Sequence, residues 1–387
     1  MEFGDLIIFN NFKNDDIFSG NCTKLIETAE KIGLGGNIFR SYLIYRLAHE
    51  PNLISETVEA TGGKIGESLY KIFQHDLKIL FECETPYSAE ILQDYKPTVP
   101  CQIESFAELE KNLSDLREIA QIAACFVEYY KKYGYGDIAA HRAFKWNPEG
   151  NKLAGIKHFE NIRLNDLIGY AEQKEMLKNN TTAFIEGKPA NNVLLVGARG
   201  TGKSSGVKAL VNEYFKSGLR LVQITKPQLK NLPEIMDALR KFASKRFIIF
   251  LDDLSFEETE SEYKYLKSSI EGGVESRPEN VLIYATSNRR HLIHETWRDR
   301  TDAQEDLYRD DSLNATISLS DRFGLIIHYY APSQAEYLEI IRYMLKKKNV
   351  ALDDETLRIE GLRWEMSHSG RNGRTAQQFV NYYLGQK

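Results

Sequence analysis

The sequence predicts an α/β fold with a five-stranded parallel sheet that is sandwiched by helices. An all-helical N-terminal domain precedes this core, and a helical lid follows it at the C-terminus. Two observations support this fold class. After residue 160, short apolar runs alternate with helical or loop segments, as in parallel sheets that are covered on both faces. Elsewhere, apolar residues recur at helical spacing. The expected divisions are a helical domain at 1–135, a linker at 136–160, the α/β core at 161–331 and the lid at 332–387.

Composition places the chain among soluble globular proteins. Its 387 residues suffice for two or three domains, and 42% hydrophobic and 27% charged residues are ordinary contents for that class. The formal net charge of −5 argues against a bulk electrostatic attraction to nucleic acid. No apolar run approaches a membrane span and the first residues are acidic, so we expect a cytoplasmic protein without membrane contact. The four cysteines lack CxxC spacing, which favours free thiols in a reducing compartment.

The first 135 residues are expected to form a helical adaptor or oligomerisation domain. In the segment at 64–83, apolar residues recur every three or four positions. A later segment opens with "SFAE", which predicts a capping box that begins at Ser105. This part of the sequence carries no catalytic constellation, so we expect its helices to bind an unidentified protein partner.

The segment at 133–160 mixes glycine, aromatic and basic residues without clear periodicity. One interpretation is that four of its side chains stack on a nucleic acid strand and neutralise it. These side chains are Arg142, Phe144, Lys145 and Trp146. The favoured alternative is a linker whose aromatic residues pack onto the next domain.

Five apolar runs predict the strands of the sheet. They lie at 192–196, 219–225, 247–251, 281–285 and 325–330. Helical or loop segments separate them, so we expect parallel strands joined by crossover connections. From Ser333 the pattern becomes helical again, and "SQAE" predicts a second capping box there.

The stretch after the first predicted strand matches the phosphate-binding motif GxxxxGK[ST] in full. Glycines let backbone N–H groups surround phosphate oxygens, and a helix that begins near Lys203 presents its free N–H groups to the same anion. Lys203 adds charge at the β- and γ-phosphates, and the Ser204 hydroxyl suits Mg²⁺. We therefore expect ATP and Mg²⁺ to bind here. The motif, with the serine after it, comprises Gly197, Ala198, Arg199, Gly200, Thr201, Gly202, Lys203, Ser204 and Ser205.

Two acids, Asp252 and Asp253, follow the third predicted strand. Asp252 would hold Mg²⁺ through water. Many such ATPases place Glu at the next position to activate the attacking water; here Asp253 stands there, and its carboxylate falls back by about 1.5 Å. A displacement of that size lowers rates on the order of 10²-fold, and Glu257 is an alternative base. Slow hydrolysis, or hydrolysis only after assembly, is therefore the working hypothesis.

Polar residues at two further strand ends could complete the site. The fourth strand ends in Thr286, Ser287 and Asn288, which could hydrogen-bond the attacking water or the γ-phosphate. Arg322 precedes the fifth strand and could complete the site of a neighbouring subunit, with an ion pair to Asp321 or another acid of its own chain as the alternative.

These motifs, in this order, resemble the AAA+ ATPase superfamily over residues 160–387. The stretches "GKPANNVLLVGARGTGKSS", "DDLSFE" and "SLSDRFGL" are also similar to a bacterial family of AAA+ proteins catalogued only as a domain of unknown function. The AAA+ resemblance assigns residues by position: Leu167, Ile168 and Gly169 beside the adenine, Asn288 as sensor 1, Arg322 as the arginine finger, and Arg374, or alternatively Arg371, as the sensor 2 arginine of the lid.

The resemblance implies an ATP- and Mg²⁺-binding AAA+ protein. We expect a slow or assembly-dependent ATPase that couples nucleotide state to homo-oligomerisation and to remodelling of a partner. The alternatives are a nucleotide-gated scaffold with little turnover and a helicase-loader-like switch on nucleic acid complexes, which the net charge disfavours. The segment at 289–320 is longer than the usual link between sensor 1 and the finger, and we interpret it as a solvated insertion, with a partner-contacting loop as the alternative.

Overall fold

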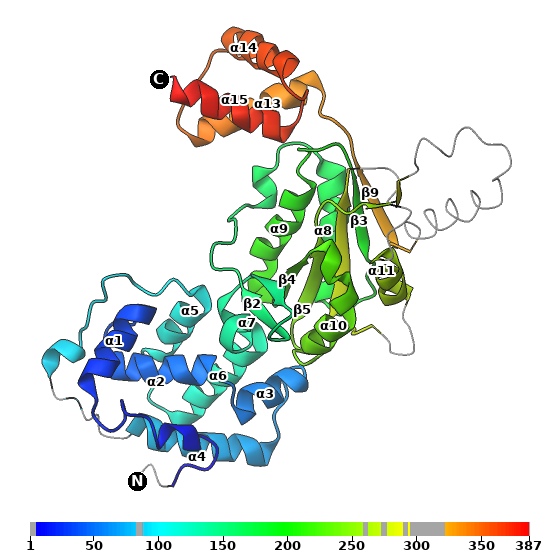
Figure 1. The fold of residues 1–387 in the computed structure, drawn as a ribbon. Coiled ribbons are helices and arrows are strands. Elements are labelled where there is room, and N and C mark those ends of the chain that lie inside the picture. Colours follow the sequence, from blue (N-terminus) through cyan, green and yellow to red (C-terminus); the bar gives the residue numbers. More distant parts are fainter. Residues whose placement is uncertain are drawn as a thin grey trace.

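The computed structural model describes residues 5–82, 87, 89–257, 262–271, 277–288, 293–294 and 322–386. Figure 1 shows three parts that follow one another along the chain: a helical N-terminal domain, a sheet covered by helices, and a small helical lid at the C-terminus. Within the described residues, no helix is both long and apolar enough to cross a membrane.

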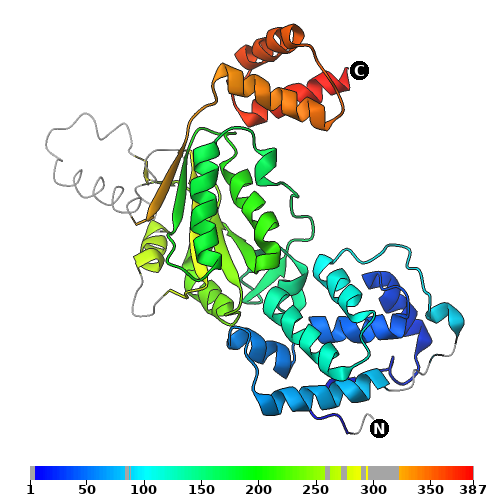
Figure 2. The same cartoon turned by 180° about the vertical axis from the view of Figure 1, so that it is seen from behind.

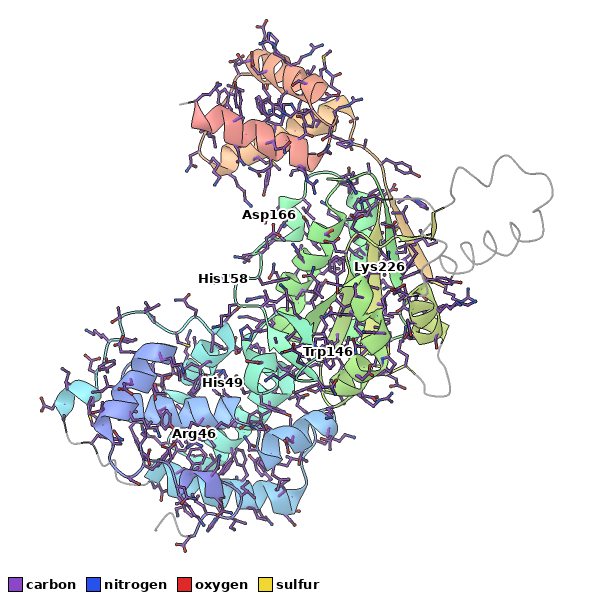
Figure 3. All side chains as sticks on the ribbon, in the orientation of Figure 1. Arg46, His49, Trp146, His158, Asp166 and Lys226 are labelled. Atoms are coloured by element: carbon purple, nitrogen blue, oxygen red, sulfur yellow. The ribbon has the colours of Figure 1, made fainter. Side chains whose placement is uncertain are left out.

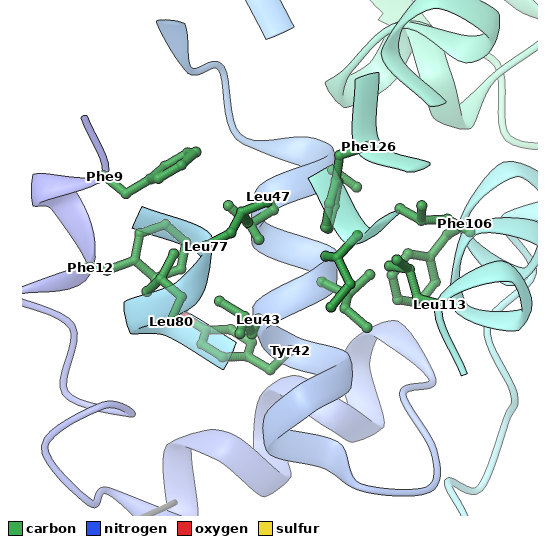
Figure 4. Close-up of a cluster of buried hydrophobic side chains, with 14 of the residues drawn as sticks. Phe9, Phe12, Tyr42, Leu43, Leu47, Leu77, Leu80, Phe106, Leu113 and Phe126 are labelled. Carbon is green, nitrogen blue, oxygen red and sulfur yellow. The ribbon is translucent and has the colours of Figure 1, made fainter. Parts of the chain in front are cut away.

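The N-terminal domain is built of helices around one apolar cluster, as the sequence predicts. Figure 4 shows α2 at the centre of this cluster, where Leu43 and Leu47 lie between the aromatic rings of the N-terminal segment and those of α5 and α6. The elements are η2 (Asn10–Phe12), α1 (Cys22–Ile32), α2 (Ile38–His49), α3 (Leu53–Ala60), α4 (Glu67–Glu82), η3 (Glu90–Leu92), α5 (Glu104–Leu113), α6 (Ile119–Tyr133) and the short α7 (Gly136–Ala140).

Two buried charged side chains hold the N-terminal segment against this cluster. The carboxylate of Asp76, in α4, accepts hydrogen bonds from the three backbone N–H groups at positions 7–9, at 2.8 to 3.2 Å. Arg46, in α2 (Figure 3), forms an ion pair with Asp15. The segment is therefore an integral part of the domain rather than a loose extension.

The capping box predicted at Ser105 is wrong. α5 begins one residue earlier, and Ile103 at its N-cap position makes no side-chain cap. Ser105 is fully buried, and its hydroxyl donates to the carbonyl oxygen of Ala139 at 2.7 Å. A contact with a distant segment thus uses the hydroxyl that the local motif would have used for capping.

The central sheet has the strand order β2-β1-β4-β5-β7-β3-β9. All neighbouring strands are parallel except β1 and β2. The five predicted strands are confirmed and form the contiguous part β4-β5-β7-β3-β9. The strands are β1 (Ala143–Asn147), β2 (Lys152–Gly155), β3 (Val193–Gly197), β4 (Leu219–Ile224), β5 (Arg246–Leu251), β7 (Val281–Ser287) and β9 (Leu325–Tyr329), and β6 (Phe256–Glu257) pairs separately with β8 (Ile293–His294).

Two strands extend the predicted five, and both come from the segment expected to be a linker. β1 pairs in parallel with β4, and β2 returns antiparallel to β1. Phe144 and Trp146 are buried in the core as a result, with 0% and 3% of their surface exposed. Neither ring can stack on a nucleic acid, so that interpretation is wrong and the packing interpretation is confirmed. Arg142 pairs with Glu104 of α5.

Helices cover both faces of the sheet, because alternate residues of a strand point to opposite sides. Val193 and Leu195 of β3 pack in the cluster that contains α8 and α9. Leu194 and Val196 pack in the cluster that contains α10 and α11. Figures 1 and 2 show these two layers from opposite sides. The helices are α8 (Ala171–Ile185), α9 (Lys203–Tyr214), α10 (Leu232–Arg240) and α11 (Glu262–Glu271).

The lid is a small helical bundle with an apolar cluster of its own. The capping box predicted at its start is confirmed: the Ser333 hydroxyl accepts the N–H of Glu336, and the Glu336 carboxylate accepts the N–H of Ser333. The lid helices are α13 (Gln334–Lys347), α14 (Asp354–Ser367) and α15 (Gly373–Gly385).

Buried cations join the N-terminal domain to the core. Lys245, just before β5, is fully buried and donates to Glu59 Oε1 of α3 at 2.6 Å. Arg220 of β4 is also fully buried, and its guanidinium donates to backbone carbonyl oxygens that include that of Tyr133, at the end of α6, at 3.0 Å. Buried charges are tolerated only when their hydrogen bonds are satisfied, so the two parts share a specific interface.

Candidate nucleotide-binding site

The phosphate loop connects β3 to α9, and its glycines are required by its conformation. A Cβ on Gly197 (φ +150°) would lie 1.9 Å from the carbonyl oxygen of Tyr329 in the neighbouring β9. A Cβ on Gly200 (φ +76°) would lie 2.5 Å from Asn372 Oδ1 of the lid. α9 begins at Lys203 without a side-chain cap, which leaves the first N–H groups of the helix for an anion.

Lys203 folds back over the loop and is buried, with 6% of its surface exposed. Its ammonium donates to the carbonyl oxygens of Gly197 and Ala198, each at 2.7 Å, and to Asn288 Oδ1 at 3.1 Å. Burial lowers the pKa of this ammonium, and the two nearby carboxylates oppose the shift. The hydrogen bonds to the phosphate loop therefore fix the position of the Lys203 side chain.

Hard oxygen donors meet at the base of the loop. Ser204 Oγ donates to Asp252 Oδ1 at 2.6 Å. Thr286, at the end of β7, donates to the same carboxylate oxygen at 2.7 Å and accepts the N–H of Asp253 at 2.9 Å, so it orients both acids. A serine hydroxyl beside an aspartate carboxylate is the donor set that holds Mg²⁺ next to phosphates, and these residues fit that ion.

Asp253 has a left-handed backbone conformation, with φ at 54°. Its Oδ1 accepts a hydrogen bond from Asn288 Nδ2. Its Oδ2 lies 3.7 Å from Nη2 of Arg199, in the phosphate loop. Since Asn288 also accepts from Lys203, the second acid, the asparagine and two cations of the loop form one connected network.

A cavity of about 920 Å³ opens beside this network. Its volume lies within the range of cofactor sites, about 300–1,000 Å³. Gly197 and Ala198 lie at the base of the loop, where their carbonyls bind Lys203. The predicted nucleotide-binding and catalytic residues that line the cavity are Leu167, Ile168, Arg199, Gly200, Thr201, Gly202, Lys203, Ser204, Ser205, Asp252, Asp253, Asn288 and Arg374.

The lid supplies cavity residues that the sequence did not reveal. Ile340, Tyr343 and Met344 of α13, and Gln377 of α15, are among the residues that line the cavity. They belong to no motif, and the helical spacing of α13 is equally well explained by packing within the lid. Only the position of the lid on the core identifies them.

One wall of the cavity is a polar link between core and lid. Asp166, in η4 (Leu164–Asp166), accepts from Lys347 Nζ at 2.5 Å and from the Tyr343 hydroxyl at 3.1 Å. Burial alone would raise the pKa of Asp166, but these hydrogen bonds and one from the Arg163 backbone outweigh it and lower the pKa. Figure 3 shows Asp166 on the side of the core that faces the lid.

Two predicted arginines lie outside the cavity. Arg371 pairs with Glu365 of α14, with 3.2 Å between Nε and Oε1. Arg322 precedes the first residue of β9, whereas the phosphate loop follows the last residue of the neighbouring, parallel β3. Arg322 therefore lies at the amino ends of the strands, and the phosphate loop lies at their carboxyl ends. The side chain of Glu257 and, apart from the β8 backbone, the segment at 289–320 lie outside the described residues.

A family model described as "Protein of unknown function (DUF815)" matches residues 139–387. The chain belongs to the DUF815 family. The DUF815 match begins just before β1, so it contains the whole sheet, the phosphate loop and the lid. Within it, the order β4-β5-β7-β3-β9, with the phosphate loop after β3 and the acids after β5, is that of AAA+ P-loop proteins. This member of the DUF815 family therefore has an AAA+ fold.

Solved structures give weaker likenesses. A point mutant of Thermotoga maritima RuvB is 17% identical, with a TM-score of 0.40, over 57% of this chain and 64% of that chain. The T. maritima RuvB Holliday junction branch migration motor is 16% identical, with a TM-score of 0.36, over 57% and 71%. C. elegans PCH-2 is 16% identical, with a TM-score of 0.39, over 58% and 65%. At these values the likenesses carry no conclusion about function. A search of curated proteins finds no match.

Proposed function

We propose that the chain binds ATP with Mg²⁺, hydrolyses it slowly, and couples nucleotide state to assembly with copies of itself and to remodelling of a protein partner. The observation that carries this proposal is the meeting of Lys203, Ser204 and Asp252 at the base of a glycine-rich loop, beside a cavity of about 920 Å³. Lys203 would bind the phosphate chain, Ser204 and Asp252 would hold the divalent cation, and the cavity would hold the base and the sugar.

The loop and the cavity offer a separate region for the phosphates and for the base of the nucleotide. The phosphates would lie on the loop, where the free N–H groups at the start of α9 and the Lys203 ammonium supply positive charge. Lys203 would exchange loop carbonyl oxygens for phosphate oxygens. The base would lie among apolar side chains from both walls, Leu167 and Ile168 of the core and Ile340 and Met344 of the lid.

The metal, when bound, neutralises charge that develops on the phosphate oxygens. Ser204 and Asp252 would hold it, directly or through water. Thr286 fixes the Asp252 carboxylate by donating to it at 2.7 Å, which supports a pre-organised site.

Asp253 supports slow turnover. We expect it to accept the proton of the attacking water, but Asn288 already donates a hydrogen bond to one of its carboxylate oxygens. Its side chain is also one methylene shorter than glutamate, a displacement that lowers rates on the order of 10²-fold.

Assembly is supported by the position of Arg322. It lies at the opposite end of the strands from its own phosphate loop, which supports the proposed role in the site of a neighbouring copy. The N-terminal helices, which contribute nothing to the described lining of the cavity, remain the expected site of partner binding.

Calorimetric titration with MgATP and MgADP, and light scattering with ATP, ADP and no nucleotide, test this proposal. The wild type should bind both nucleotides and enlarge with ATP, and phosphate release per subunit should rise with protein concentration. Lys203→Met should bind neither nucleotide. Absence of binding by the folded wild type would overturn the proposal.

A nucleotide-gated scaffold is the second candidate, favoured by the double engagement of the Asp253 carboxylate. It differs in one measurable respect: ATP would drive assembly without phosphate release at any protein concentration. The switch acting on nucleic acid loses its main support, because the Phe144 and Trp146 rings are buried.

A further inference from the structure

Arg199 occupies the third position of the phosphate loop, on the side that faces Asp253. Its Nη2 lies 3.7 Å from Asp253 Oδ2, and both residues line the cavity. The side chains are 72% and 58% exposed, respectively. Ion pairs this exposed contribute little to stability, so the pairing does not explain why a cation stands here.

The surroundings of Arg199 define which phosphate it faces. α9 begins at the end of the loop, Ser204 and Asp252 are the proposed holders of the metal, and Asp253 follows Asp252 in the chain. In a triphosphate laid along the loop, the phosphoryl group beside the metal-binding pair and the second acid is the γ-phosphate. Under the proposed function, Asp253, the partner of Arg199, would therefore lie next to the γ-phosphate.

We infer that Arg199 is a γ-phosphate ligand supplied by the chain's own loop, an inference that rests on the proposed function. Its guanidinium leaves Asp253 for the γ-phosphate when ATP binds and pairs with Asp253 again when ADP remains. A phosphate dianion competes well for this guanidinium because the fork of N–H donors matches phosphate oxygens and the existing pair is exposed.

The move of Arg199 to the γ-phosphate also removes the ion pair from the Asp253 carboxylate. Once Arg199 has moved, Oδ2 of Asp253 is available to the attacking water while Asn288 still holds Oδ1. Water oxygen then bonds to the γ-phosphorus, the bond from that phosphorus to the ADP oxygen breaks, and the water proton goes to Oδ2. Arg199 thus makes the availability of the Asp253 carboxylate as a proton acceptor depend on the presence of the γ-phosphate.

Calorimetric titrations with MgADP and with Mg²⁺ and a non-hydrolysable ATP analogue test this role in Arg199→Ala and Arg199→Lys. Loss of a charge-assisted hydrogen bond should weaken triphosphate binding about tenfold in Arg199→Ala. MgADP affinity should change by less than about twofold, because the first two phosphates keep all their contacts. Arg199→Lys should recover part of the loss.

Arg371→Ala is the matched control, since Arg371 pairs with Glu365 outside the cavity, and it should change neither affinity. Equal weakening of diphosphate and triphosphate binding by Arg199→Ala, or no weakening of either, would overturn the inference alone. A wild type that binds neither nucleotide would overturn the proposed function and the inference with it.

Discussion

The backbone N–H of Gly373 donates a 2.9 Å hydrogen bond to the carbonyl oxygen of Gly200. The first residue of the last lid helix therefore contacts the phosphate loop directly. Asn372, which caps that helix by accepting the N–H of Thr375 at 2.9 Å, occupies the space that a side chain on Gly200 would need. Because this hydrogen bond joins the phosphate loop to the lid, we expect a change in the loop to alter the position of the lid.

Gly200→Ala should disrupt both elements. The new Cβ would lie 2.5 Å from Asn372 Oδ1, in a residue whose φ of +76° already disfavours a side chain. We expect MgADP affinity to fall about tenfold, because left-handed strain and the clash together cost roughly 1–2 kcal/mol or more. Gly66→Ala, where an added Cβ meets nothing within 4 Å, is the control in the same calorimetric titration. Wild-type affinity in Gly200→Ala would contradict the contact.

Arg322→Ala should leave nucleotide binding unchanged and reduce assembly-dependent turnover. We expect this because Arg322 lies at the amino ends of the strands, whereas its own phosphate loop lies at their carboxyl ends. An arginine supplied by a neighbour accelerates hydrolysis by roughly 10³-fold or more, so phosphate release should no longer rise with protein concentration. If Arg322→Ala instead loses MgATP binding to the same degree as Lys203→Met, the role assigned to it is excluded.

The Asp166–Lys347 link should slow nucleotide release. Lys347 is 54% exposed, so the pair is worth less than about 1 kcal/mol, and its loss should accelerate release of fluorescent ADP about two- to fivefold. Stopped-flow displacement would measure this in Asp166→Asn, in Lys347→Met and in the double variant, which should match the single variants rather than sum them. Lys346→Met serves as the control. Additive effects would show that the two side chains act independently.

Glu108 should make stability depend on acid pH. Burial alone would raise its pKa, but hydrogen bonds from Lys132, Tyr133 and Lys216 outweigh it and lower the pKa from 4.5 to about 2. A carboxyl whose pKa is lower in the folded state stabilises the fold above its unfolded pKa, and this contribution is lost as pH falls from about 4.5 toward about 2.

Glu108→Gln should therefore lower the free energy of unfolding by about 1 kcal/mol near neutral pH, a value reduced by solvent screening of the exposed lysines. The difference from the wild type should shrink as the pH of the urea titrations approaches about 3. Glu118→Gln is the control. A difference that stays constant across this range would contradict the shifted pKa.

The parallel core of the sheet could be predicted because strands buried on both faces are nearly continuous apolar runs. The phosphate loop could be predicted because its chemistry lies within eight consecutive residues, from Gly197 to Ser204. The acids that follow β5 could be placed for a related reason, since the carboxyl ends of parallel strands meet at one edge.

Other features depend on residues far apart in the chain. β1 could not be predicted because it is short, lies in a segment without clear periodicity, and becomes a strand only by pairing with its neighbours in the sheet. The Asp166–Lys347 link and the Gly373–Gly200 contact join the lid to segments more than 170 residues away, and neither has a local signal. The contact between Arg199 and Asp253 likewise exists only once the loop stands beside β5.

The strand β1 also decides how this protein can be divided. It covers the edge of β4 through the pairs Ala143↔Leu221, Phe144↔Val222 and Lys145↔Gln223. A fragment that starts at residue 161 would leave the N–H and C=O groups on that side of β4 without partners. Such an open edge recruits strands from other molecules, so the fragment should aggregate even though it retains every nucleotide-binding motif.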